Sequence, residues 1–333
     1  MCNGSALLRW LVHPPRRCIP AFLLPSFHRA RGRHRAMLIH RPFHQLPLNR
    51  RGRDFVVGDV HGHAALLDHL LAAVRFDTAC DRLIALGDLI DRGPDSLALL
   101  TRVEKLPWFY SLRGNHEAML QDSSRNVMSA LLWYRNGGQW GQEIADETLH
   151  ALIRLVDGLP LAMTLPLADG RRIGLIHAEV PVGMSWSDVE ALNRQHRRPL
   201  QDRDRDPDDD SLAATVLWGR TRITACEGLR SLVHPERLSM SRLASLRCAL
   251  QPVAGIDQII AGHSYSQDRR PIASANVLFI DTGVFEHDGR LTLLEPLRQR
   301  CWQARYDRHR QPQIIDDEGE PAPRPRALPA AFA

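Results

Sequence analysis

Five short segments of this chain each begin with an apolar, strand-like run and end on side chains that can bind metal ions. They comprise residues 55–62, 83–93, 112–117, 173–178 and 259–263. Oxygen and imidazole ligands at repeated strand ends are what a site for two divalent metal ions requires. A hydrolase that attacks phosphorus with a metal-bound hydroxide needs such a site. The series therefore predicts an α/β fold whose strand ends carry a dinuclear hydrolytic centre.

Within these segments, the candidate metal ligands are Asp59, His61, Asp88, Asn115, His177 and His263. Asp59 and His61 are two residues apart, so an extended strand end would face both the same way. Asp88 also ends an apolar run, and its two carboxylate oxygens can bridge two cations. The remaining three ligands are neutral, which leaves the site positive charge for a phosphate and a nucleophilic water.

Further side chains beside these ligands suit catalysis. His116 follows the ligand Asn115 and is placed to protonate a leaving alkoxide, and Asp91 can orient its imidazole. Arg92 and Arg113 adjoin the metal segments and can grip phosphate oxygens with their forked guanidinium groups.

Composition excludes several classes of protein. The 333 residues contain no apolar run near the roughly 20 residues of a membrane-spanning helix. The six cysteines are scattered, which argues against a zinc cluster or disulfide framework and favours a reduced, cytoplasmic protein. Residues 1–53 hold eleven arginines and no acid, whereas residues 54–333 hold 32 basic and 38 acidic residues, a net charge of −6. An acidic body with a basic leader does not indicate nucleic-acid binding.

The pattern predicts three regions. Residues 1–53 form a basic leader, expected to be disordered; residues 1–36 fit either a transit peptide or a start read too early, with Met37 as the working start. Residues 54–297 alternate strands and helices, including a helix after Gly62 and another over 97–103. Residues 201–210 read as a solvated charged loop, and residues 298–333 as a Pro-rich disordered tail.

These segments resemble the phosphoprotein phosphatase family of metallophosphoesterases, especially its small bacterial and phage members, such as the phosphatase of phage lambda. That family reads Gly-Asp-x-His-Gly, Gly-Asp-x-x-Asp-Arg-Gly and Gly-Asn-His-Glu, followed by two later histidines, and all are present here in order. Local likeness extends to 136–140, 177–181, 216–223 and 280–283, so that the resemblance covers about 54–295.

The resemblance implies two facing mixed β-sheets flanked by helices, the calcineurin-like fold, with ligands on loops at strand ends. It assigns Asp59, His61 and Asp88 to the first metal, and Asp88, Asn115, His177 and His263 to the second. It implies two divalent ions, manganese or an iron–zinc pair, and a phosphorylated protein or peptide as substrate. It also matches Arg220 to a phosphate-binding arginine, although Arg222 could take that place.

Two other functions compete with a serine/threonine phosphatase. A symmetrical bis(5'-nucleosyl)-tetraphosphatase has a similar metal core, but such enzymes tend to read Ala-Arg-Gly and Asn-His-Asp. This chain instead has Asp91-Arg92-Gly93 and Asn115-His116-Glu117, which favours the phosphatase. A binding protein on an inactive hydrolase fold would be expected to have lost ligands, and here the whole set is intact.

Overall fold

The computed structural model describes residues 42–192, 212–230, 239–315 and 319–324. Residues 1–41 of the leader and the charged loop 201–210 therefore lie outside the described residues. Within the described part of the chain, no helix is long and apolar enough to cross a membrane.

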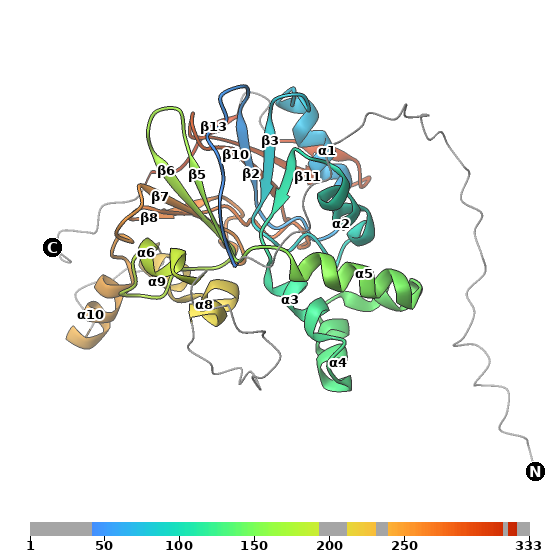
Figure 1. Cartoon of the computed structure of the whole chain (residues 1–333). Helices are drawn as coiled ribbons and strands as arrows, with labels where there is room; N and C mark the ends of the chain where they lie inside the picture. Colours follow the sequence, from blue (N-terminus) through green and yellow to red (C-terminus); the bar gives the residue numbers. More distant parts are fainter. Residues whose placement is uncertain (1–41, 193–211, 231–238, 316–318, 325–333) are drawn as a thin grey trace, which may run out of the picture. The chain divides into compact units, whose positions relative to one another are not determined.

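Two mixed β-sheets form the centre of the fold (Figure 1). The first sheet has the order β1 (Phe43–Gln45), β5 (Ala162–Pro166), β6 (Arg172–Ile176), β7 (Gln258–Ala261), β9 (Val277–Phe279) and β8 (Ile272–Ser274). The second has the order β12 (Pro312–Ile314), β11 (Arg300–Tyr306), β10 (Leu291–Glu295), β2 (Asp54–Val57), β3 (Arg82–Ala85) and β4 (Phe109–Ser111), with β13 (Glu320–Pro321) paired to β11. Each sheet contains parallel and antiparallel pairs. In the first sheet β5 is parallel to β1 and antiparallel to β6, and in the second β2 is parallel to β3 while β10 is antiparallel to β11.

Strand side chains alternate between two apolar cores. In β2, Phe55 and Val57 pack in the core beneath the helices of the second sheet, while Val56 joins the core between the sheets. In β7, Ile259 and Ala261 face the other helical layer, and Ile260 enters the same inter-sheet core. Because both faces of these strands are buried, their sequences are continuous apolar runs rather than alternating ones.

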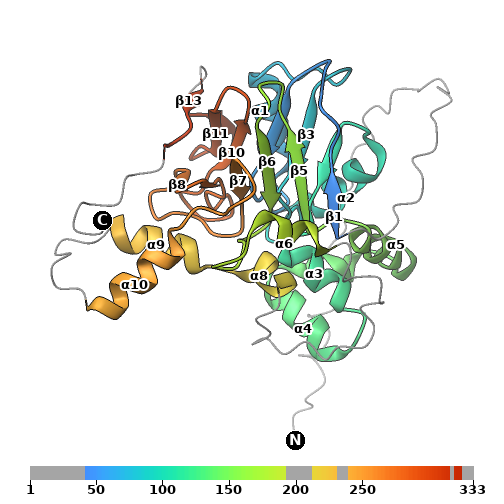
Figure 2. The ribbon, with the colours of Figure 1, turned by 60° about the vertical axis from the view of Figure 1, so that its left-hand side comes forward.

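Helices cover the outer face of each sheet and complete a four-layer arrangement, as expected. The helices are α1 (Ala64–Ala73), α2 (Ser96–Lys105), α3 (Asn115–Asp122), α4 (Val127–Arg135), the 3-10 helix η1 (Gly138–Glu143), α5 (Asp146–Asp157), α6 (Trp186–Glu190), α8 (Leu212–Trp218), α9 (Thr221–Arg230) and α10 (Met240–Ala249). Figures 1 and 2 show α9 and α10 on one side of the fold and α3, α4 and α5 on the other. The predicted helices after Gly62 and over 97–103 are confirmed as α1 and α2.

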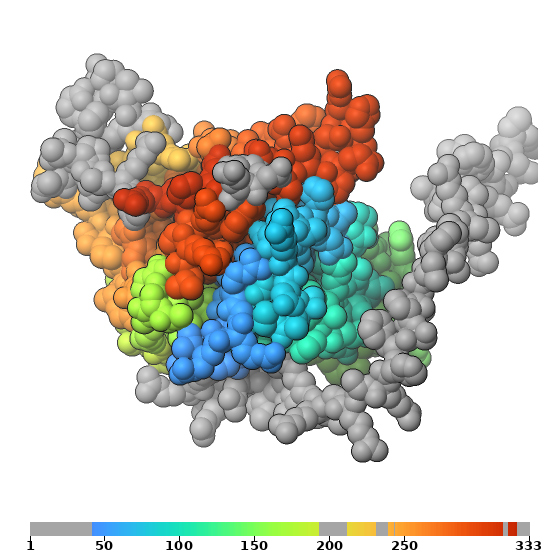
Figure 3. All heavy atoms as spheres, turned by 90° about the horizontal axis from the view of Figure 1, so that it is seen from above, coloured from blue at the N-terminus to red at the C-terminus, as the bar shows by residue number. Residues whose placement is uncertain are grey.

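The sheets extend beyond the domain limits that we expected at residues 54 and 297. At the N-terminal side, β1 pairs in parallel with β5, and Leu46 is buried between the sheets. At the C-terminal side, β11 pairs with β10 and completes the sheet with β12 and β13. Figure 3 shows the orange-red C-terminal part of the chain beside the blue and cyan N-terminal part. The composition of this segment is misleading because β11 contains the polar residues Arg300, Gln303 and Arg305, although Cys301, Trp302 and Ala304 are buried.

We predict that Leu46→Ala destabilises the domain by about 2–5 kcal/mol, the usual cost of removing a fully buried leucine. Leu46 is 1% exposed and packs in the inter-sheet core. Gln45→Ala, at the exposed neighbouring position of β1, is the control and should change stability by less than about 0.5 kcal/mol. Urea unfolding followed by circular dichroism measures both. Equal stability of the two variants would show that this leader segment does not belong to the folded domain.

Candidate metal centre

Strand ends from both sheets bring the candidate ligands together. Asp59 and His61 follow β2, Asp88 follows β3, His177 follows β6, His263 follows β7, and Asn115 is the first residue of α3. Cross-sheet hydrogen bonds join these loops: the His263 N–H donates to both Asp59 carboxylate oxygens, at 3.0 and 3.1 Å. All six side chains are buried.

Backbone carbonyls set the tautomers of two histidines. His61 Nδ1 lies 3.0 Å from the Ile90 carbonyl oxygen, and His177 Nδ1 lies 2.9 Å from that of Leu86. Because a carbonyl only accepts hydrogen bonds, Nδ1 of each ring carries the proton and Nε2 keeps its lone pair. Burial lowers the pKa of both rings, which favours the neutral form that a metal ligand needs.

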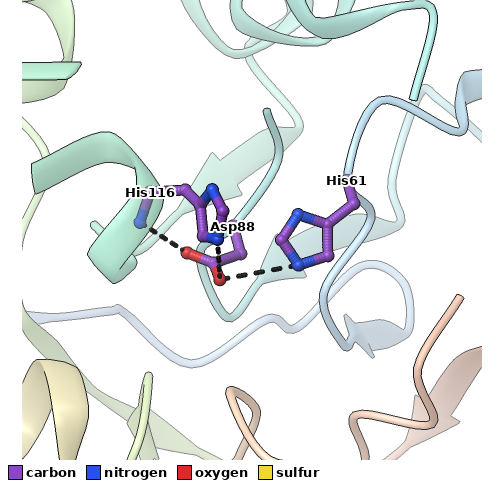
Figure 4. A group of neighbouring side chains, drawn as sticks. All are labelled: His61, Asp88 and His116. Atoms are coloured by element: carbon purple, nitrogen blue, oxygen red, sulfur yellow. Dashed lines mark hydrogen bonds and ion pairs between the residues drawn. The ribbon is translucent and has the colours of Figure 1, made fainter. Parts of the chain in front are cut away.

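The Asp88 carboxylate lies between histidines on different strands. Its Oδ1 is 3.5 Å from His177 Nε2, and its Oδ2 is 3.7 Å from His61 Nε2. Figure 4 shows Oδ2 between the rings of His61 and His116. Burial opposes ionisation, but the surrounding histidines, His177 foremost, hold the pKa of Asp88 below its usual range. One carboxylate oxygen thus faces each half of the pocket, as a bridging ligand requires.

The donor chemistry around Asn115 fits a cation. Its Oδ1 lies 2.9 Å from His177 Nε2 and 2.9 Å from His263 Nδ1. The Nε2 of His177 has no proton to donate, because Nδ1 holds it against Leu86. Two lone-pair atoms therefore face one another at 2.9 Å, an arrangement that a bound cation would stabilise.

The number of buried carboxylate groups in the pocket also favours the binding of cations. Asp59 and Asp281 are both buried beside Asp88. Burial, together with Asp281 and Asp88, raises the pKa of Asp59, and burial raises the pKa of Asp281 to about 6. Of the predicted ligands, His61 and Asp88 lie in one potential metal-binding group, which also contains His116, and Asp88, His177 and His263 lie in a second. The residues therefore fit two divalent ions that share the Asp88 carboxylate.

Several ligands have a backbone conformation that non-glycine residues seldom adopt. His61, Asp88 and His263 have φ values of 43°, 48° and 65°. Such conformations persist only where the surrounding structure enforces them. The His61 N–H donates to the Asp88 carbonyl at 2.8 Å, which ties the turns after β2 and β3 together.

The Glu117 carboxylate joins the turn after β3 to the start of α3. Its oxygens accept the N–H groups of Asp88, Leu89 and Gly114 at 2.8, 2.9 and 2.8 Å. Glu117 is fully buried, and burial together with Asp88 raises its pKa to about 7. A Cβ at Gly114 would lie 2.1 Å from Asp88 Oδ1, so only glycine permits this approach.

Comparison with known proteins agrees with this geometry. The profile of the calcineurin-like phosphoesterase family matches residues 55–267. The chain belongs to this family. It is therefore a phosphoesterase, a hydrolase whose family uses a dinuclear metal centre, and the expected fold is confirmed.

Curated relatives of this phosphoesterase have two kinds of name. Serine/threonine-protein phosphatase 1 of Salmonella typhimurium is 30% identical over 72% of this chain and 89% of its own length. Serine/threonine-protein phosphatase 2 of Escherichia coli is 29% identical over 72% of this chain and 90% of its own length. The symmetrical bis(5'-nucleosyl)-tetraphosphatase of Cellvibrio japonicus is 27% identical over 69% of this chain and 90% of its own length.

Close to the ligands, His116 and Asp91 form a buried pair. His116 Nδ1 lies 2.6 Å from Asp91 Oδ2, and His116 Nε2 lies 3.9 Å from Asp88 Oδ2. Burial opposes protonation of the imidazole, but Asp88 and Asp91 outweigh it and raise the pKa of His116. The ring therefore holds a proton more readily than the ligand histidines around it.

The arginines divide into exposed and buried groups. Arg92 is exposed, stacks 3.8 Å above the ring of Phe285, and brings Nη1 to 3.2 Å from His61 Nε2. Arg220 is also exposed, and its charge contributes to lowering the pKa of His177 and His263.

Arg222 and Arg113 instead donate to backbone oxygens. Arg222 is buried and donates to the carbonyls of Val180, Ala249 and Gln251. The structure thus distinguishes Arg220 from Arg222, which the sequence left open. Arg113 differs from our expectation of a phosphate contact, because its guanidinium donates to Gln121 and to backbone carbonyls at the end of α5.

Sequence reasoning missed several residues that contact the site. Trp133 and Trp140 donate to Asp91, Phe285 supports Arg92, and Asp281 crowds Asp59. Trp140 and Asp281 lie in segments, 136–140 and 280–283, that we noted for family likeness without assigning a role. For Phe285 the sequence offered no signal, since nothing local shows that residue 285 reaches residue 92.

We predict that Asp88→Asn lowers the divalent metal content of the purified protein more than other single carboxylate changes. The amide removes the charge that both halves of the pocket share and can offer only one oxygen. Elemental analysis after dialysis against a metal buffer measures metal per chain. Asp169→Asn, at an exposed hairpin position, is the control and should keep the full content. A normal content in Asp88→Asn would contradict the bridging arrangement.

Proposed function

We propose that this phosphoesterase is a metal-dependent protein serine/threonine phosphatase, which hydrolyses phosphate monoesters on proteins or peptides. The observation that carries the proposal is the buried His116–Asp91 pair beside the ligand pocket. A carboxylate-supported imidazole is most useful where the leaving group is a basic alkoxide that must be protonated. Serine and threonine alkoxides are such groups, whereas a nucleotide phosphate is a weaker base and leaves with less help.

The metal pair would be held by Asp59, His61, Asp88, Asn115, His177 and His263. Two divalent cations bound there, manganese in our proposal, supply charge for the phosphate and lower the pKa of a water molecule. Asp88 supplies one oxygen to each half of the pocket, and the carbonyls of Ile90 and Leu86 keep two histidines in the ligand tautomer.

The protein's own side chains then act on the substrate. Arg92 and Arg220, both exposed at the pocket, bind and orient the phosphate oxygens. The stacking of Arg92 on Phe285 limits the rotamers of its guanidinium before substrate arrives. His116 donates the proton at Nε2 to the leaving oxygen, and Asp91 holds Nδ1 so that Nε2 faces the reaction.

Names of relatives support the proposal without deciding the substrate. The relatives named serine/threonine-protein phosphatases are 29–30% identical to this chain, and the tetraphosphatase of Cellvibrio japonicus is 27% identical. The tetraphosphatase is therefore the second candidate. In this chain, Asp91 provides the carboxylate for His116 at the position where such enzymes tend to have alanine.

We predict a higher kcat/KM for a phosphoserine or phosphothreonine peptide than for diadenosine tetraphosphate, measured under one manganese condition. The reason is that a monoester dianion offers three free oxygens to Arg92 and Arg220, and its leaving group requires the His116 proton. Protein treated with a chelator should lose activity on both substrates and regain it with manganese. A clear preference for the dinucleotide would replace this proposal with the tetraphosphatase assignment.

We also predict that His116→Asn lowers kcat on a phosphoserine peptide by about 10²–10⁴-fold, the usual contribution of general acid catalysis. With p-nitrophenyl phosphate the loss should be much smaller, because that leaving group departs without a proton. His69→Asn, at an exposed position on α1, is the control. Similar losses on both substrates, at unchanged metal content, would show that His116 is not the acid.

A further inference from the structure

The Asp91 carboxylate accepts hydrogen bonds from two indoles as well as from His116. Trp140 Nε1 lies 2.8 Å from Oδ1, and Trp133 Nε1 lies 3.2 Å from Oδ1 and 3.1 Å from Oδ2. An indole N–H can only donate, and it is held by a rigid ring. Asp91 is fully buried, so water does not compete for these positions.

We propose that Trp133 and Trp140 are positioning residues, which hold the Asp91 carboxylate in the rotation that presents Oδ2 to His116 Nδ1. With Oδ1 bound by Trp140, the carboxylate cannot turn about its terminal torsion without losing a hydrogen bond. Such terminal torsions are otherwise broad and weakly restrained. The two indoles therefore orient His116 indirectly, and neither touches the substrate.

The local sequence builds this arrangement. Trp133 lies near the end of α4 and Trp140 lies in η1, and their rings meet edge to face at 5.7 Å and 85°. A Cβ at Gly138 or Gly141 would lie 2.3 Å from atoms of the Trp133 ring. The loop can pack this closely only because both positions are glycine, and that packing brings the two N–H groups to one carboxylate.

The same loop contacts the turn that carries Asp91 and Arg92. Gly137 has a φ of 108°, and a Cβ there would lie 2.7 Å from the Arg92 backbone nitrogen. The Asp91 N–H donates to Ser96 Oγ at 2.9 Å, which fixes the other side of the turn. Residues 133–141 thus form one support for the acid pair.

Packing alone would account for Trp133, which is fully buried in the apolar core. It accounts less well for Trp140, which is only half-buried yet directs its one polar group at the catalytic carboxylate. The two roles predict different kinetics. If Trp140 positions the acid pair, the loss of activity on its substitution should depend on the leaving group, whereas a loss caused by poorer packing should not.

The inference rests on the proposed role of His116, and Trp140→Phe tests it, since phenylalanine keeps a ring and removes the N–H. We expect kcat on a phosphoserine peptide to fall about 10-fold, as for the loss of one hydrogen bond to a charged group. On p-nitrophenyl phosphate we expect less than about a 2-fold change, because proton donation matters little there. Metal content and KM should stay unchanged.

Trp108→Phe is the matched control. Trp108 packs against Phe76 and Phe109 in the same apolar core, and its substitution should leave the ratio of the two activities unaltered. Equal losses on both substrates in Trp140→Phe, or no loss on either, would overturn the inference if His116→Asn shows the expected leaving-group dependence. If His116→Asn does not show it, the proposed acid itself is wrong, and the catalytic part of this inference falls with it.

A second readout does not depend on activity. The chain has seven tryptophans, whose indole N–H signals can be observed by NMR after 15N labelling. Trp140→Phe and Trp133→Phe assign two of these signals. Asp91→Asn should move both upfield, because a neutral amide accepts more weakly than a carboxylate. If both signals stay in place, the indoles do not bind Asp91 in solution and the proposal is overturned.

Discussion

The buried Glu117 carboxylate restrains the loops on which the ligand pocket depends. It accepts N–H groups from Asp88, Leu89 and Gly114, so one side chain fixes both the turn after β3 and the start of α3. Asp88 sits in this turn with a positive φ, a conformation that the chain would not keep without such support. With Asp88 in place, the histidines from both sheets have a common partner.

Hydrogen bonds outside the ligand set define the chemistry of the pocket. Backbone carbonyl groups fix the tautomers of His61 and His177 by accepting the Nδ1 proton, which leaves Nε2 available to a metal ion. His116 lies in the same pocket but has Asp91 instead of a carbonyl at Nδ1. Burial lowers the pKa of His61 and His177, whereas at His116 the charges of Asp88 and Asp91 outweigh the effect of burial and raise the pKa. The hydrogen bond at Nδ1 thus suits each of these neighbouring imidazoles to the role that we propose for it, metal ligand or acid.

The strand-then-ligand segments predicted an α/β fold and the set of residues that meet at the strand ends, and the family resemblance that they carry implied the two facing sheets. Prediction failed where a contact joins distant parts of the chain. Arg113 looks like a phosphate ligand because it adjoins Asn115, but its guanidinium reaches the end of α5. The polar stretch after residue 297 looked like a tail, although β10 supplies it with an antiparallel partner and its apolar residues find a core. The carbonyls that Arg113 reaches lie 44 and 46 residues away along the chain. β10 is the neighbouring strand of β11, but core residues that pack on Trp302, such as Phe55, lie far away in the sequence.

The sequence by itself determined the metal-binding chemistry of this phosphoesterase, because the ligand types and their short spacings are properties of single strand ends. It also determined the fold class, since buried strands require continuous apolar runs. Only the tertiary structure decided that Arg220 rather than Arg222 is exposed at the pocket, and that Trp133 and Trp140 converge on Asp91. The physical reason is that a ligand's identity is carried by its own atoms, whereas a side chain's direction depends on what packs against it. That packing partner comes from another layer of the fold, which spacing along the chain does not reveal.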